Sequence, residues 1–181
     1  MTDILDRDST STSASSGATE PVFRSSETLA DNLQKVHVDL IELHLQGKQA
    51  HWNVVGRNFR DTHLILDEII EAARTFSDEV AERMRALYIT PDGRSKTVSA
   101  NTSLPEFPEG EVDTAETINL VAQRLYATVG TMRGVHDAID EEDPSTADLL
   151  HAMIIRLEQF AWMVSAENRV ANKSEPKPIH E

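Results

Sequence analysis

Cysteine is absent from this chain of 181 residues, which excludes disulfide bonds and thiol catalysis. Also absent is a run of the roughly 18 apolar residues that a transmembrane helix requires. The first residues are polar and acidic and do not resemble a signal peptide. These absences predict a cytoplasmic protein with no membrane partner, and they leave association with the nucleoid open.

Basic residues are scarce, since 17 lysines and arginines stand against 31 acidic residues and give a formal net charge of −14. A surface of this kind repels nucleic acid and attracts cations. Simple solubility is the alternative explanation of the charge. The balance favours a cation as ligand over a nucleic acid.

The length predicts one domain with a tail at each end. Residues 1–24 are rich in serine and threonine and poor in large apolar side chains, so we expect a disordered N-terminal tail. Residues 25–171 carry the periodic apolar pattern of a folded domain. Residues 172–181 form a short C-terminal tail that contains two prolines.

Apolar residues at helical spacing predict an all-α fold with four long helices. The first helix opens at Ser25 or Ser26 and ends at Gly56 through a left-handed C-cap, and Asn58 caps the second, which ends before Pro91. The predicted core positions are Leu29, Leu33, Val36, Leu40, Leu43, Gly47, Ala50 and Val54 in the first helix, and Phe59, Leu66, Ile70, Ala73, Val80, Met84 and Leu87 in the second.

The second half of the domain begins with a long connection over residues 91–112, which a bundle needs if its second and third helices run parallel. Asp113 and Glu116 form a capping box for the third helix, which runs to about Glu141. Asp143 caps the fourth helix, with Pro144 at its first position. Two glycines of the third helix, Gly130 and Gly134, are interpreted as sites of close packing. His37 and His44 are interpreted as surface or interface histidines, and His136 as a surface histidine.

The segment from 48 to 83 contains two histidines and three carboxylates at helical spacings: His51, His63, Asp67, Asp78 and Glu82. On a helical wheel the last four fall within an arc of about 100°. Histidine and carboxylate side chains on one stripe indicate a metal site. The alternative is an ordinary amphipathic helix with solvated acids.

A single helix cannot close such a site, because His63 and Glu82 are about 28 Å apart at 1.5 Å per residue. The midpoint of His63 and Glu82 and the midpoint of Asp67 and Asp78 coincide between residues 72 and 73. An antiparallel copy related by a two-fold axis near Ala72 and Ala73 would bring the two pairs together. We therefore predict metal sites shared between two subunits, with the two alanines allowing close approach.

The same segment resembles the Dps family of DNA-protecting mini-ferritins, in HWNVVGRNF and in the four ligand positions that follow it. The resemblance extends from about residue 25 to 171. It implies a ferritin-like four-helix bundle with a short extra helix, around 95–100, in the long connection between the second and third helices. It also implies a ferroxidase centre with His51, His63 and Asp67 from one subunit and Asp78 and Glu82 from its partner.

By the same resemblance, the reaction is oxidation of Fe(II), preferably by hydrogen peroxide, with at most two irons per site. Ferric mineral would be stored in a hollow homo-oligomer of twelve subunits built from two-fold dimers, and DNA would be protected from oxidative damage. Zinc can compete for the same donor atoms. None of the seven histidines has a glutamate three residues before it, which argues against a di-iron site inside one subunit.

Further residues carry weaker assignments. Lys48 tunes the site, or is a surface lysine, and Trp52 packs beside the site, with electron donation to oxidants as a further role implied by the resemblance. Glu68 and Glu71 are candidates for mineral nucleation. The resemblance makes Asp143 and Asp148 candidates for an acidic pore, against the alternative of a solvated cap cluster.

Two other functional classes remain as alternatives. A bound metal can make water a nucleophile, so a hydrolase of small amides or esters is one. A DNA-binding nucleoid protein is the other, and the lysine-poor tails argue against it.

Overall fold

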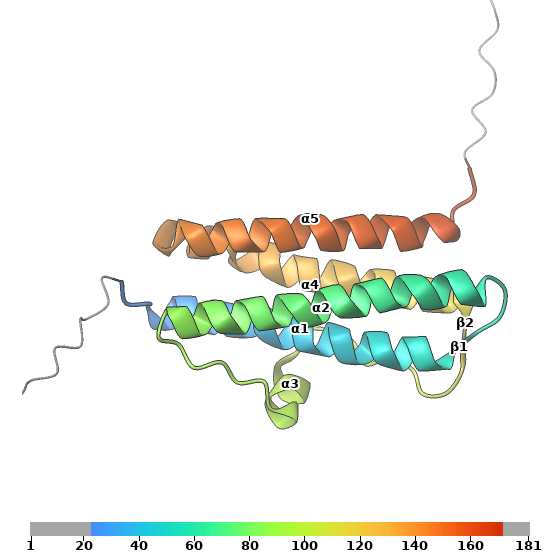
Figure 1. Ribbon diagram of the computed structural model, residues 1–181, viewed down its shortest axis with the longest axis horizontal. Coiled ribbons are helices and arrows are strands. Elements are labelled where there is room, and N and C mark those ends of the chain that lie inside the picture. The colour runs from blue at the N-terminus through green and yellow to red at the C-terminus, as the bar shows by residue number, and fades with distance from the viewer. Residues whose placement is uncertain (1–22, 172–181) are drawn as a thin grey trace, which may run out of the picture.

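Four long helices lie side by side in the computed structural model, which describes residues 23–171 (Figure 1). This confirms the predicted all-α bundle. The predicted disorder of the tails concerns residues that lie, apart from Phe23 and Arg24, outside the described part. The elements are α1 (Glu27–Asn53), β1 (Val54–Val55), α2 (Phe59–Ala86), α3 (Ser95–Asn101), β2 (Val112–Asp113), α4 (Thr114–Glu142) and α5 (Pro144–Glu167).

The helix starts follow the capping residues that the sequence supplies. The hydroxyl of Ser26 accepts a hydrogen bond from the N–H of Leu29 at 3.0 Å, which selects Ser26 over Ser25 as the cap of α1. The carboxylate of Asp113 accepts hydrogen bonds from the N–H groups of Ala115 and Glu116 and so caps α4. Both caps satisfy donors that a helix start leaves free.

The predicted end of the first helix is wrong. α1 ends at Asn53, and the next two residues extend as β1, which pairs in parallel with β2. Gly56 follows with φ 114° and shapes the turn rather than the cap. Asn58 does precede α2, but its φ is 59° and its side chain makes no capping hydrogen bond. Pairing with a distant segment thus overrides the local glycine signal.

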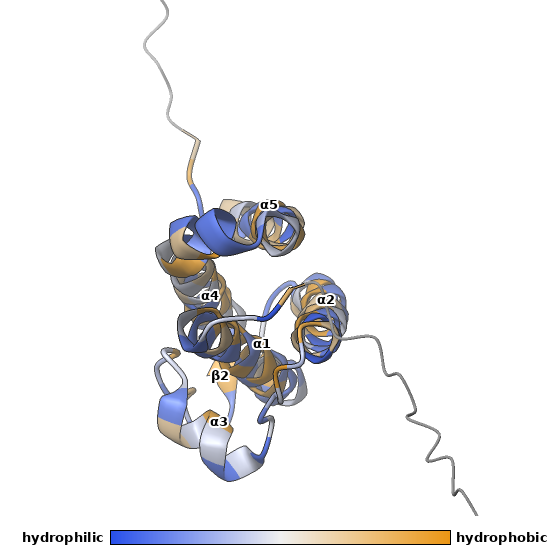
Figure 2. Ribbon diagram, turned by 90° about the vertical axis from the view of Figure 1, so that its left-hand side faces the viewer, coloured by the Kyte–Doolittle hydropathy of each residue, from blue (hydrophilic) through white to orange (hydrophobic). Residues whose placement is uncertain are grey.

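The β1–β2 pair joins the C-terminal end of α1 to the N-terminal end of α4, so these two helices run antiparallel. It follows that α2 and α4 run parallel and that the long connection is a crossover, as predicted. Figure 2, viewed along the helices, shows α3 outside the bundle on the side of α1 and α4. None of the helices within residues 23–171 is long and apolar enough to cross a membrane.

The core consists of the predicted stripes with few exceptions. Every predicted position of the first helix and its continuation is buried, from Leu29 to Val54. In the second stripe Phe59 is the exception, at 44% exposure, because it begins α2 at the end of the bundle. Burial of these aliphatic side chains supplies the main stabilising free energy of the bundle.

Several smaller predictions are wrong. Ala73 is fully buried in the core of its own bundle, so its side chain does not provide the predicted close contact with a second copy. His37 is 6% exposed and His136 is partly buried, so neither is an exposed surface residue of the described chain, and the interface alternative for His37 stays a prediction. A Cβ added at Gly130 or Gly134 would meet nothing within 4 Å in the described chain, so neither glycine permits close packing there.

Candidate metal centre

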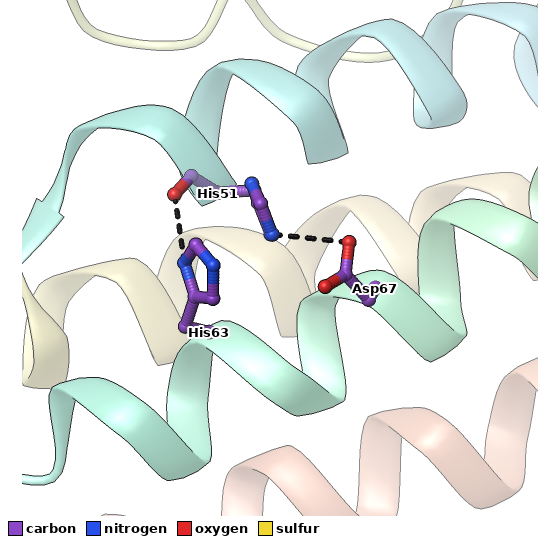
Figure 3. A group of neighbouring side chains, drawn as sticks. All are labelled: His51, His63 and Asp67. Carbon is purple, nitrogen blue, oxygen red and sulfur yellow. Dashed lines mark hydrogen bonds and ion pairs between the residues drawn. The ribbon is translucent and has the colours of Figure 1, made fainter.

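Two helices bring three predicted ligands together. His51 lies in the last turn of α1, and His63 and Asp67 lie in the first turns of α2, just after the turn that joins the helices. One ligand atom from each residue can be chosen so that all lie within 4.8 Å of one another. Figure 3 shows the three side chains converging. Among residues 23–171 this group stands alone as a cluster of three or more such side chains.

The two histidines are stacked, with ring centroids 3.6 Å apart. Nδ1 of His63 lies 3.2 Å from the carbonyl oxygen of His51. A carbonyl can only accept, so Nδ1 carries the proton and Nε2 of His63 keeps a free lone pair. A backbone hydrogen bond of this kind orients metal-binding histidines.

The surroundings of His51 are those of a metal ligand. Both of its ring nitrogens are buried, and neither makes a hydrogen bond within the described part of the chain. Nε2 nonetheless lies 3.0 Å from Oδ1 of Asp67, at the distance of an ion pair. Buried polar atoms normally have partners, so a ring whose Nδ1 has no partner in the described chain and whose Nε2 faces a carboxylate fits a site built for a cation.

Lys48 shares the carboxylate of Asp67. Its Nζ donates to Oδ1 at 3.1 Å, on the same oxygen that faces His51. Partial desolvation would raise the pKa of Asp67, but the contacts with Lys48 and His51 outweigh it and lower the pKa below its usual value. Asp67 is therefore ionised and available to a metal, at the cost of its contact with Lys48.

The other two predicted ligands lie far from this cluster in the single chain. Asp78 and Glu82 are exposed side chains in the C-terminal half of α2, and the rise of the helix places Glu82 about 28 Å from His63. The structure thus brings together three of the five predicted ligands. The shared site across a two-fold axis stays a prediction.

Asp78 borders a hollow of about 560 Å³ between α1 and α2, which also contains His37 and Gly93. Nδ1 of His37 donates to the carbonyl oxygen of Ser77 at 3.1 Å. Burial lowers the pKa of His37, against smaller opposing effects of that hydrogen bond and of Asp92. The sequence analysis did not predict that His37 lies near Asp78. The apolar residues on either side of His37, Val36 and Val38, could have indicated that it is buried.

The secondary candidates have distinct surroundings. Trp52 is 71% exposed at the end of α1. Glu68 and Glu71 border a second hollow of about 650 Å³ together with Asp67 and Arg156, and Arg156 lies 3.7 Å from Glu68. Their role in nucleation stays a prediction.

The pore candidates differ from each other. Asp143 is 9% exposed and accepts a hydrogen bond from Arg83 at 2.6 Å, whereas the side chain of Asp148 is exposed. Within one chain Asp143 therefore joins α2 to the start of α5. The assignment of both residues to a pore stays a prediction.

Two imidazoles and one carboxylate that converge with open positions are typical of ferrous iron that reacts with oxidants. The cluster is chemically incomplete as a two-metal site, because three side chains cannot surround two ions. Further ligands would have to come from outside this chain or from solvent.

The chain is similar to known proteins along most of its length, and the ferritin-like domain family matches residues 30–172. DNA protection during starvation protein 2 of Deinococcus radiodurans is 36% identical over 74% of this chain, which spans 56% of that protein. The fine tangled pili major subunit of Haemophilus ducreyi is 35% identical over 76% of this chain and 73% of its own length. The solved structure of Mycobacterium smegmatis Dps matches with a TM-score of 0.78 and 29% identity, covering 84% of this chain and 89% of that one.

Proposed function

This chain belongs to the Dps family of ferritin-like proteins, and we propose that it oxidises Fe(II) and stores the ferric product inside a hollow shell of its own copies. The observation that carries the proposal is the convergence of His51, His63 and Asp67, with the buried Nδ1 of His51 lacking a hydrogen-bond partner in the described chain. A site of this kind binds a divalent transition metal, and iron is the metal that the family stores.

Each complete centre is formed by two subunits. His51, His63 and Asp67 of one copy face Asp78 and Glu82 of the other, so that up to two irons have five side-chain ligands. Support comes from the coincident midpoints of the two ligand pairs and from the exposure of Asp78 and Glu82 in the single chain. Zinc is a competitor for the same atoms.

Hydrogen peroxide is the preferred oxidant in this proposal. Two Fe(II) ions each give up one electron, and the two electrons cleave the O–O bond of one peroxide molecule. Uptake of two protons yields two waters rather than a hydroxyl radical. Removal of iron and peroxide together would protect DNA without contact with it, which agrees with a net charge of −14.

The test is an anaerobic titration with Fe(II), followed by stoichiometric peroxide, on the wild type and on the double variant His51→Ala/His63→Ala. We expect fast ferric absorbance in the wild type and at least a tenfold loss of rate in the variant, with particle mass unchanged. The variant His136→Ala is the matched control, because this α4 histidine contacts Asp137 and not the cluster. Equal rates in wild type and double variant would refute the site.

Particle mass and shape test the assembly separately. We propose a shell of twelve subunits in the cytoplasm, with Asp148 exposed toward an iron-entry pore. One relative is named as a pilus subunit, so a filament is the competing assembly. Electron microscopy of the purified protein distinguishes a closed shell from a filament, and a gel-shift at low and physiological salt tests DNA binding.

A further inference from the structure

Glu71 and Arg74 lie on α2 between the two pairs of predicted ligands. On a helical wheel at about 100° per residue, both fall inside the arc of about 100° that runs from His63 to Glu82 and also contains Asp67 and Asp78. The hollows agree with this placement, because Glu71 borders both the hollow beside Asp67 and the hollow beside Asp78. Arg74 borders the second of these. The centre of the ligand face therefore carries one negative and one positive charge.

Within one chain Glu71 and Arg74 form only a long, exposed ion pair. Nη1 of Arg74 lies 3.9 Å from Oε2 of Glu71, and the two side chains are 71% and 70% exposed. Exposed pairs three residues apart on a helix contribute a few tenths of a kcal/mol. Both charged groups remain accessible to a second molecule.

Glu71 and Arg74 are placed symmetrically about the same point of α2 as the predicted metal ligands. The midpoint of Glu71 and Arg74 falls between residues 72 and 73, where the midpoints of the two ligand pairs also fall. In an antiparallel crossing about that point, Glu71 of each copy lies opposite Arg74 of the other. A two-fold interface repeats every contact, so two ion pairs form around the axis.

We propose that these two reciprocal ion pairs between Glu71 and Arg74 set the register in which two copies of α2 cross. The inference rests on the proposed function, because that register is the one that brings His63 and Asp67 of one copy to Asp78 and Glu82 of the other. The partner is a second copy of this chain.

In this proposal, ion pairs between charged side chains determine the register of the two α2 helices, and contacts between alanines do not. Ala73 points into its own core and Ala72 lies on the far side of the helix from the ligand arc, so close backbone contact through alanines does not fix the register. The same register places Asp67 opposite Asp78, two like charges that repel in the absence of metal. Ion pairs across an interface determine specificity and register more than affinity, so the metal-free dimer depends on Glu71 and Arg74 for its alignment.

The test uses opposite charge reversals in separate chains. Glu71→Arg alone places arginine opposite arginine, and Arg74→Glu alone places glutamate opposite glutamate. We expect each variant to lose at least tenfold in dimer affinity. When the two variants are produced together with different tags, both cross-axis pairs are restored, and mixed dimers should dominate. No chain in the mixture regains a pair within its own helix, so rescue reports contact between subunits.

The matched control pairs Glu79→Arg in one chain with Lys96→Glu in the other, since both residues are exposed and lie outside the ligand arc. This control should show no preference for mixed dimers. The register proposal is overturned if the single reversals assemble as the wild type does, or if mixing gives no preference for mixed dimers beyond the control.

Iron oxidation is measured on the same samples, so that a failure of the ferroxidase proposal can be distinguished from a failure of the register proposal. A wild type that oxidises no iron, combined with mixed-dimer rescue, refutes the ferroxidase and supports the register. A wild type that oxidises iron, combined with single reversals of normal mass and rate, supports the ferroxidase and refutes the register.

Discussion

Asp39 on α1 accepts two hydrogen bonds from Ser103 in the crossover, from its N–H at 2.7 Å and from its hydroxyl at 2.6 Å. The hydroxyls of Thr102 and Thr131 donate to the same carboxylate at 2.9 and 2.6 Å. Asp39 is 1% exposed. One buried carboxylate therefore holds α1, the crossover and α4 together.

Replacing Asp39 by asparagine should destabilise the protein by about 1–3 kcal/mol, because the amide NH2 would face donors and leave them unsatisfied. The measurement is urea unfolding at fixed protein concentration, since assembly shifts apparent stability. Asp31→Asn on the exposed face of α1 is the control and should change little. Equal midpoints for the two variants would contradict the role of Asp39.

The ion pair between Arg83 and Asp143 should make stability depend on pH. Burial would raise the pKa of Asp143, but the hydrogen bond from Thr146 and the contact with Arg83 lower it. The stabilisation is therefore complete above the unfolded-state pKa of about 3.9 and is lost as pH falls through the lowered folded-state pKa. Asp143→Asn should cost about 1–3 kcal/mol at pH 7, and the difference from wild type should shrink as pH falls below the unfolded-state pKa.

An exposed ion pair provides the comparison for Asp143. Arg133 and Glu158 are also 2.6 Å apart, but their side chains are 60% and 39% exposed. Glu158→Gln should therefore cost less than about 1 kcal/mol at pH 7. If both substitutions cost the same, burial is not what makes the Arg83 pair stabilising.

Removing the charge of Lys48 should strengthen metal binding. The ammonium group shares Oδ1 of Asp67 with any ion and repels it. Since two charges about 4 Å apart interact with about 1 kcal/mol in water and more near a protein, Lys48→Gln should tighten binding by about tenfold. Anaerobic titration calorimetry with Fe(II) measures this. Weaker binding would show that Lys48 holds Asp67 in place for the metal.

Protonation of His37 should destabilise the protein in acid, in a pH range above that of Asp143. The pKa of His37 is lowered by burial, so the neutral ring stabilises the folded state above the unfolded-state pKa of about 6.5. That stabilisation is lost as pH falls through the lowered pKa. In His37→Asn the amide can still donate to Ser77, but it does not titrate. Melting temperatures of the metal-free proteins between pH 7.5 and 5 should fall less steeply in the variant.

The parts of the fold that depend on local chemistry were predictable from the sequence. Ser26 and Asp113 cap helices because their side chains reach N–H groups within three residues. The apolar stripes predicted burial because helix periodicity alone decides which side faces the core. For the same reason the spacing of His63 and Asp67 predicted that these two side chains lie on one face of α2.

What the sequence could not give depends on distant segments. Gly56 signalled a helix end, but pairing of Val54 with Val112 ended the helix earlier. Ala73 suggested a helix crossing, yet contacts with other helices bury it in its own core. His37 is interpreted from the sequence as a surface or interface histidine, and its burial within the chain was not foreseen because its partner, the carbonyl of Ser77, is 40 residues away. In each case a long-range contact overrode a local preference.

α2 runs unbroken from Phe59 to Ala86, and this fixes the spacing of the two centres in the proposed dimer. One centre lies near residue 65 of the first copy and the other near residue 80, which is about 22 Å apart along the helix at 1.5 Å per residue. A peroxide molecule cannot bridge that distance, and a rigid helix cannot shorten it. The two centres of the proposed dimer would therefore react independently, and a dimer with one centre disabled should keep half of its rate.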